Sequence, residues 1–168
     1  MQVPSMVILG LAGAAVAFAS GVHAQESTKP ASESGFVLEE IVVTAQKRAE
    51  SLQKVPVTIT ALTGDQLAAQ QIQAPGDLVR AVTNLQINTA VGPSIPIFSL
   101  RGISMMDFSL AQNGPIAVYY DEVYKGNFAI LGLGMFDLER VEVLKGPQGT
   151  LYGKNTTGGA INFVSRKP

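Results

Sequence analysis

The sequence predicts an α+β domain built on a small mixed β-sheet, with short helices and long glycine-rich loops. Two runs near its end, residues 141–144 and 160–164, alternate between the residues of one strand face and those of the other. Both runs are also rich in strand-forming residues. The segment between them is rich in glycine, which indicates backbone at positive φ or backbone pressed close to a neighbour. Earlier, residues 55–88 read as a strand, two short helices and a second strand, the pattern of a compact α/β unit.

The first 24 residues read as an export signal. Residues 6–18 form an unbroken run of apolar residues and glycines, and Val22-His23-Ala24 before Gln25 fits a small-residue cleavage site. The run is shorter than the ~20 residues that a membrane-spanning helix needs, so a membrane anchor is the less favoured alternative. Residues 1–5 contain no Lys or Arg, which departs from the usual start of a signal peptide. We expect residues 1–24 to be removed on export.

The composition of the remaining chain excludes several kinds of chemistry. His23 is the only histidine of the 168 residues, and the sequence contains no cysteine. The mature chain therefore has no thiol nucleophile, no histidine base and none of the usual zinc or haem ligands. Its 12 Lys and Arg against 13 Asp and Glu give a net charge of −1, which does not suit nucleic-acid binding. We predict that the chain is not an enzyme and holds no cofactor and no metal ion.

One glycine-rich stretch has a superficial likeness to a phosphate-binding loop. Residues 149–154 read Gly-Thr-Leu-Tyr-Gly-Lys, followed by Asn155. A P-loop has four residues between its glycines and a Ser or Thr after its lysine, and this stretch has neither feature. An enzyme with a nucleotide-binding loop is therefore a poor alternative.

The N-terminal part of the mature chain changes character twice. Residues 25–38 are polar, small and interrupted by Pro and Gly, which predicts a flexible leader. Residues 39–45, Glu-Glu-Ile-Val-Val-Thr-Ala, are strongly β-prone. They are either an ordinary edge strand or a segment that another protein's sheet captures through main-chain hydrogen bonds. The pattern alone favours an edge strand, and the position behind a flexible leader favours capture.

The folded part is expected to begin with a strand at residues 55–62. Thr63 and Gln66 have the spacing of a capping box, which predicts a short helix that runs through Ile72 and ends before Pro75. Pro75 opens a second short helix, and residues 85–88 alternate like a strand.

The middle of the chain is predicted with less regular structure. Residues 97–103 read as a strand that stops at a glycine, and residues 104–114 lack clear periodicity. Residues 115–124 read as a strand and a turn. Glu122 occupies a turn position at which glycine is common, which predicts a different turn type. Residues 127–137 are expected to form a loop or a short helical turn.

The end of the chain carries two motifs. Residues 139–153 read ERVEVLKGPQGTLYG, and residues 158–162 read GGAIN. This stretch resembles the end of the plug domain of TonB-dependent outer-membrane receptors, in which E-R-V-E-V-L-[KR]-G-P-x-[GS]-x-L-Y-G leads to G-G-x-I-N. The matching residues are Glu139, Arg140, Val141, Glu142, Val143, Leu144, Gly146, Pro147, Gly149, Leu151, Tyr152, Gly153, Gly158, Gly159, Ile161 and Asn162.

The resemblance covers residues 39–168 and implies roles for particular segments. Residues 46–168 are then a plug domain, and residues 39–45 are the TonB box, which the C-terminal domain of TonB grasps. The implied TonB-binding residues are Glu40, Ile41, Val42, Val43, Thr44 and Ala45. Candidates for ion pairs with the wall of the receptor's own β-barrel are Arg101, Glu139, Arg140 and Glu142. Candidates for solute contact are Met105, Met106 and Phe108, for which ordinary packing is the favoured alternative.

The implied function is gating of transport across the bacterial outer membrane. The plug would fill the barrel and help to bind a scarce solute such as a ferric siderophore, a cobalamin or an oligosaccharide. TonB would then pull on the leader from the periplasm. No transmembrane barrel is expected in this chain, which is interpreted as a piece of a longer receptor or a truncated gene product. A free-standing periplasmic binding or signalling module is the alternative.

Overall fold

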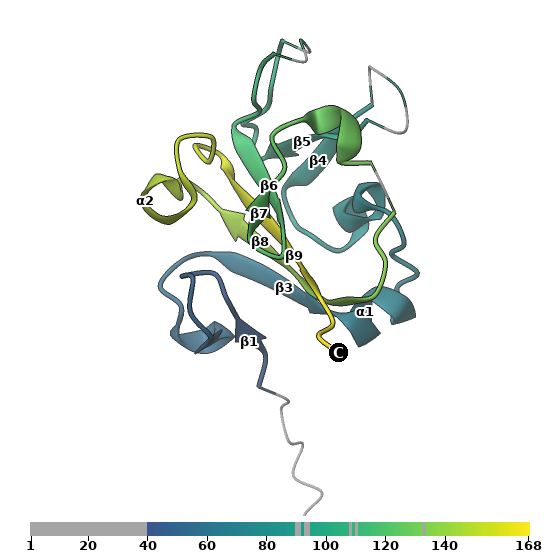
Figure 1. Cartoon of the computed structure of the whole chain (residues 1–168), viewed down its shortest axis with the longest axis vertical. Coiled ribbons are helices and arrows are strands. Elements are labelled where there is room, and N and C mark those ends of the chain that lie inside the picture. Colours follow the sequence, from purple (N-terminus) through teal and green to yellow (C-terminus); the bar gives the residue numbers. More distant parts are fainter. Residues whose placement is uncertain (1–39, 90–91, 93–94, 108, 110, 133) are drawn as a thin grey trace, which may run out of the picture. The chain divides into compact units, whose positions relative to one another are not determined.

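A five-stranded mixed sheet forms the centre of the structure (Figure 1). The structure is a computed structural model, and it describes residues 40–89, 92, 95–107, 109, 111–132 and 134–168. The strand order is β3 (Ile59–Thr63), β8 (Leu138–Lys145), β9 (Gly159–Ser165), β6 (Ile116–Tyr120) and β7 (Val123–Tyr124). Strands β6 and β9 are parallel, and the other neighbours in this sheet are antiparallel. The predicted fold class, a small mixed sheet with short helices, is confirmed.

The two strands predicted from the C-terminal alternation are neighbours at the middle of the sheet. Val143 pairs with Ile161, and Glu142 pairs with Asn162. Because successive residues of a strand point to opposite faces, Val143 and Ile161 enter the main core while Glu142 and Asn162 point to the other face. Both polar side chains are nevertheless buried.

The main core lies between one face of the sheet and a layer of short elements. These are α1 (Gly64–Ala69), the 3-10 helices η2 (Pro75–Arg80) and η3 (Phe128–Ile130), and a separate two-stranded sheet of β4 (Leu85–Asn88) and β5 (Ile97–Leu100). Leu78, Leu100 and Phe163 are among the largest side chains that this core encloses fully or almost fully. None of the helices in the described residues is both long and apolar enough to cross a bilayer.

The opposite face of the sheet is covered by residues 41–55, which we call the N-terminal strap. In the strap, β1 (Val42–Val43) pairs with β2 (Glu50–Ser51), and the 3-10 helix η1 (Leu52–Lys54) follows. The strap packs on small apolar side chains of the sheet and on Tyr152 of α2 (Gly149–Tyr152). Within the described residues, regular secondary structure therefore begins with β1. The sequence predicted that the folded part would begin only at residue 55. The predicted signal peptide and leader (residues 1–38) lie outside the described residues.

The predicted capping box is confirmed, and the helix that it opens is shorter than predicted. Thr63 Oγ1 accepts a hydrogen bond from Gln66 N at 3.3 Å, and Gln66 Oε1 accepts one from Thr63 N at 3.0 Å. Helix α1 ends at Ala69 because the chain turns through Gln71 at a φ of +53°. The strand at residues 85–88 pairs with β5 in the separate sheet, so residues 55–88 do not form a single α/β unit.

The turn between β6 and β7 also differs from the prediction. Asp121 and Glu122 have φ angles of +46° and +69°, so both central residues are left-handed, as a type I′ hairpin turn requires. The turn therefore keeps a conformation that suits glycine although Glu122 stands there. Asp121 accepts hydrogen bonds from the N–H and the hydroxyl of Ser165, both at 2.8 Å, which supports this conformation.

Candidate functional site

The segment predicted to bind TonB is a short strand packed on the second face of the sheet. Val43 and Ala45 are buried, whereas Val42, which precedes them, is 46% exposed. This alternation follows from the extended backbone, which points successive side chains to opposite sides. The structure thus gives residues 41–45 the features of the edge-strand interpretation. It contains no partner chain, so TonB capture stays a prediction.

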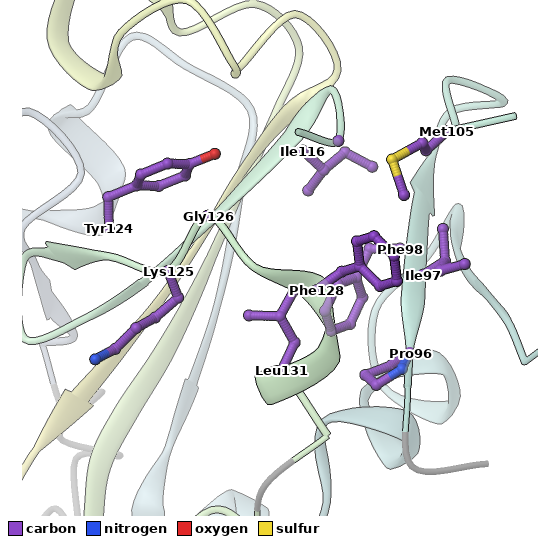
Figure 2. Close-up of a pocket in the computed structure, with 11 residues that line it drawn as sticks. Pro96, Ile97, Phe98, Met105, Ile116, Tyr124, Lys125, Gly126, Phe128 and Leu131 are labelled. Atoms are coloured by element: carbon purple, nitrogen blue, oxygen red, sulfur yellow. The ribbon is translucent and has the colours of Figure 1, made fainter. Parts of the chain in front are cut away.

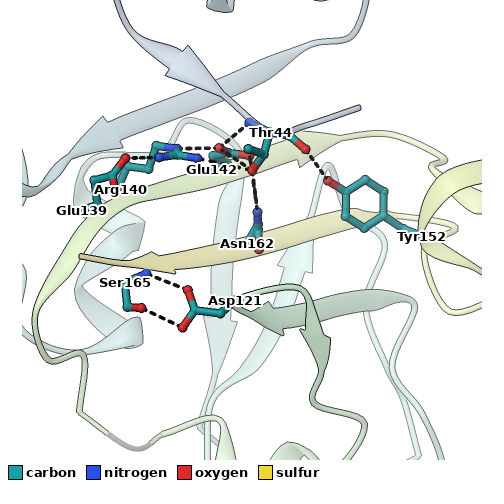
Figure 3. Close-up of polar contacts among 8 residues, drawn as sticks. All are labelled: Thr44, Asp121, Glu139, Arg140, Glu142, Tyr152, Asn162 and Ser165. Atoms are coloured by element: carbon teal, nitrogen blue, oxygen red, sulfur yellow. Dashed lines mark hydrogen bonds and ion pairs between the residues drawn. The ribbon is translucent and has the colours of Figure 1, made fainter. Parts of the chain in front are cut away.

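Thr44 connects this segment to the centre of the sheet through the carboxylate of Glu142 (Figure 3). The Thr44 N–H donates to Glu142 Oε1 at 2.7 Å, and the Thr44 hydroxyl donates to the same oxygen at 3.1 Å. Arg140 Nε donates to that oxygen at 2.7 Å, and Asn162 Nδ2 donates to the Thr44 hydroxyl at 3.3 Å. The Glu142 side chain is fully buried. A buried carboxylate is tolerated when a cation and hydrogen-bond donors surround it, and this site supplies both.

The carbonyl of Thr44 is also occupied. It accepts a hydrogen bond from Lys47 N at 2.9 Å and another from the hydroxyl of Tyr152 at 3.4 Å. Burial, and secondarily the nearby Glu142 charge, raises the pKa of Tyr152, so its hydroxyl stays protonated and can donate. The Lys47 ammonium lies 4.7 Å from the centroid of the Tyr152 ring and 5.0 Å from that of Tyr119, within cation–π range.

Four residues of this cluster were absent from the predicted site: Lys47, Tyr119, Tyr152 and Asn162. The Tyr119 hydroxyl donates to the Tyr152 carbonyl at 2.5 Å, which fixes α2 against β6. Tyr152 and Asn162 belong to the C-terminal motifs. Those motifs indicated a family resemblance, but they did not predict a contact with the strap. The one local signal was the polar Glu142 between Val141 and Val143, which predicted a second sheet face.

The four candidates for barrel contact have different surroundings. Glu142 has its partners within this chain and no exposed surface, so we no longer propose it as a barrel contact. Arg140 forms ion pairs with Glu139 and Glu142 and is mostly buried, whereas the Glu139 side chain is 48% exposed. Arg101 is exposed at the end of β5, in a turn with a φ of +53°.

A second cation lies beside Arg101. Burial, with a smaller contribution from the Arg101 charge, lowers the pKa of Lys145 at the end of β8. Within the described residues no ion pair joins either cation to a carboxylate. Among the described residues, this corner of the sheet therefore carries two positive charges without an acidic ion-pair partner.

The candidates for solute contact also divide. Met105 is buried and lines a cavity of about 20 Å³ with Phe98, Ile116 and Phe128, among others (Figure 2). A cavity of this size holds about one water molecule, so Met105 fits the ordinary packing interpretation. Met106 is 89% exposed and remains available for contact. Phe108 lies outside the described residues.

Two other features bear on metal and nucleotide binding. The described residues contain no group of three or more His, Cys, Asp or Glu placed to hold a metal ion. The stretch compared with a P-loop forms the single-turn helix α2, and the next residue, Gly153, caps it with a φ of +81°. Its residue Tyr152 turns inward to the strap.

Comparison with known proteins identifies the class. Residues 51–160 match the family described as the TonB-dependent Receptor Plug Domain, and the chain belongs to this family. The resemblance inferred from residues 139–162 is thereby confirmed. The family and its relatives are receptors, which also confirms the prediction that the chain is not an enzyme.

Individual relatives are similar over most of the chain. It is 34% identical to the pesticin receptor of Yersinia pestis over 130 residues, which are 76% of this chain and 19% of that protein. It is 32% identical to the rhizobactin receptor of Rhizobium meliloti, over 90% of this chain and 20% of that protein. The crystal structure of the ferric yersiniabactin uptake receptor FyuA from Yersinia pestis superposes with a TM-score of 0.61 at 32% identity, covering 67% of this chain and 17% of FyuA. The chain therefore spans about a fifth of the length of these relatives.

Proposed function

We propose that this chain is the plug of an outer-membrane receptor that takes up a ferric siderophore, and that TonB drives transport by pulling on the N-terminal strap. The observation that carries the proposal is the family match over residues 51–160, together with relatives whose names are those of siderophore receptors. These names favour a siderophore over the cobalamin and the oligosaccharide that the sequence left open.

The plug acts as a gate because it fills the lumen of a β-barrel that other parts of the receptor form. Arg101 and Lys145 are the groups that we assign to the contact with the barrel wall, where carboxylates would pair with them. Such pairs hold the plug in register and can separate without exposing a large apolar surface. Glu139, which is half-exposed beside Arg140, is a further candidate on the same sheet.

The strap is the part of the plug on which force acts. Its β1 strand is extended backbone, the form that another protein's sheet edge can bind through main-chain hydrogen bonds. In this proposal the leader lies in the periplasm, and the C-terminal domain of TonB pairs with residues 40–45. The solute side of the plug includes the exposed Met106.

Uptake by cells tests the proposal. The gene of the complete receptor is deleted and replaced by the native sequence or by one with Met106→Ala. Accumulation of ⁵⁵Fe is then measured with a panel of ferric siderophores, with cobalamin uptake measured in parallel. We expect one siderophore to enter only when the native gene and TonB are both present, and more slowly with Met106→Ala. Uptake of every siderophore at the same rate with and without the gene would overturn the proposal.

A further inference from the structure

We propose that Glu142 is a latch on the N-terminal strap, because its carboxylate holds the backbone group of Thr44 that a partner strand needs. The strap is then either docked on the plug or captured by a partner, and not both. This inference rests on the proposed function, since the partner strand is that of TonB. It assigns to one buried residue the control of when the strap becomes available.

The two edges of β1 have different occupants. Ile41 O accepts a hydrogen bond from Leu52 N at 2.9 Å, so the main-chain groups of Ile41 face β2. Because alternate residues of a strand direct these groups to opposite edges, Val43 also faces β2, while Val42 and Thr44 face away. Among the described residues no strand pairs with this second edge. An incoming strand would therefore bind there.

Thr44 is the position at which the second edge is closed. Its N–H donates to Glu142 Oε1 at 2.7 Å. Its carbonyl accepts hydrogen bonds from Lys47 N and from the Tyr152 hydroxyl. A partner strand would need the same N–H and carbonyl, and its own backbone would occupy the space of the Glu142 carboxylate. Capture beyond Val42 therefore requires that Thr44 leave Glu142.

Glu142 is suited to a reversible contact because it keeps partners when the strap leaves. Arg140 Nε lies 2.7 Å from Oε1, and Asn162 Nδ2 lies 3.5 Å from Oε2. The carboxylate is thus still paired with a cation inside the sheet after Thr44 departs. Opening breaks the contacts of the strap and leaves the pairing of β8 with β9 intact.

The latch is tested by the accessibility of a thiol under the strap. Ala45 is 1% exposed and the sequence contains no cysteine, so Ala45→Cys gives one labelling site that reacts only when the strap opens. Thr44→Val removes the hydroxyl contacts with Glu142 and Asn162 but keeps the N–H for a partner. Glu142→Gln weakens the same contact from the other side, and the exposed Thr83→Val is the matched control.

In the full chain we expect both Thr44→Val and Glu142→Gln to speed labelling about tenfold, and Thr83→Val to leave the rate unchanged. Circular dichroism establishes that each variant keeps the native fold. Equal labelling rates in the native chain and in both folded variants, Thr44→Val and Glu142→Gln, would overturn the latch. If Glu142→Gln does not fold, Thr44→Val alone decides the result.

A second readout separates the latch from the proposed partner. The purified C-terminal domain of TonB is added, and its capture of each variant is measured by pull-down. We expect capture to rise in the order in which labelling rises. If labelling is faster but TonB captures all variants to the same non-zero extent, the strap can be docked and captured at once. That result would overturn the claim that the two states exclude each other. Faster labelling with no capture by any variant would refute TonB as the partner and leave Glu142 as the contact that holds the strap.

Discussion

Gly159, the first residue of β9, lies directly against Leu144 of β8, so closely that a Cβ atom at position 159 would stand 2.3 Å from the Leu144 carbonyl oxygen. Gly159 also has a φ of +149°, which side-chain-bearing residues rarely adopt. This pair of residues closes the glycine-rich loop onto the middle of the sheet.

Gly159→Ala should destabilise the chain by about 3 kcal/mol, because both the overlap with backbone and the positive φ oppose it. Gly149→Ala is the matched control: nothing lies within 4 Å of a Cβ at that position in α2, and alanine favours helix. Urea unfolding followed by circular dichroism measures the difference. Equal midpoints for the two variants would show that the close approach of β8 and β9 is wrong.

The turn between β6 and β7 predicts changes of opposite sign at adjacent residues. Asp121→Ala removes two hydrogen bonds to Ser165 and should lower the free energy of unfolding by about 1 kcal/mol. Glu122→Gly relieves the strain of a φ of +69° and should raise the free energy of unfolding by roughly 0.5 kcal/mol. The gain is small because glycine loses more conformational entropy on folding, which offsets part of the relieved strain. Thermal unfolding of the two variants compares the effects. A stabilising Asp121→Ala would contradict the assigned turn.

Asp77 predicts a dependence of stability on pH. Its carboxylate accepts hydrogen bonds from the N–H groups of Ala74 and Gln73, which, with a smaller effect of Arg80, lower its pKa below the ordinary 3.8. A group with a depressed folded-state pKa stabilises the fold above its unfolded value, and this contribution is lost as pH falls through the folded value. Asp77→Ala should therefore cost about 1 kcal/mol at pH 7. The cost should shrink below pH 3.8, which urea midpoints at pH 7 and pH 3 measure.

Arg101 predicts a functional effect without a structural one. Arg101→Glu reverses an exposed charge, so the fold of the chain should be unchanged. If carboxylates of the barrel wall pair with Arg101 and Lys145, the variant plug should sit loosely and admit vancomycin, an antibiotic too large to cross an intact outer membrane at an effective rate. Arg101→Lys keeps the charge and is the control. Equal vancomycin sensitivity in cells that carry the two variants would argue against this contact.

The features that the sequence predicted correctly are those in which local pattern and tertiary structure agree. The alternation at residues 141–144 gave both the strand and the two faces, because one face is buried in the main core. Thr63 and Gln66 gave the start of α1, because a capping box is complete within four residues. The end of α1 was missed because Gln71 adopts a positive φ that its residue type does not indicate.

The candidate site was harder to predict because its contacts are distant in sequence. Thr44 and Glu142 are 98 residues apart, and neither segment has a pattern that indicates the other. Residues 41–45 are β-prone whether they form an edge strand or are captured by a partner, because both arrangements need an extended backbone. The contact between Glu142 and Thr44 shows that residues 41–45 are docked on the second face of the sheet. The position of Glu142 on that face depends on the whole sheet.

Cross-linking of the strap to TonB tests the central claim most directly. Val42→Pro removes an N–H at the free edge of β1, whereas the control Val42→Ala trims the side chain and keeps that N–H. In cells supplied with the transported solute, the account predicts that the native receptor and Val42→Ala cross-link to TonB and that Val42→Pro does not. Cross-linking of Val42→Pro at the native level would contradict it.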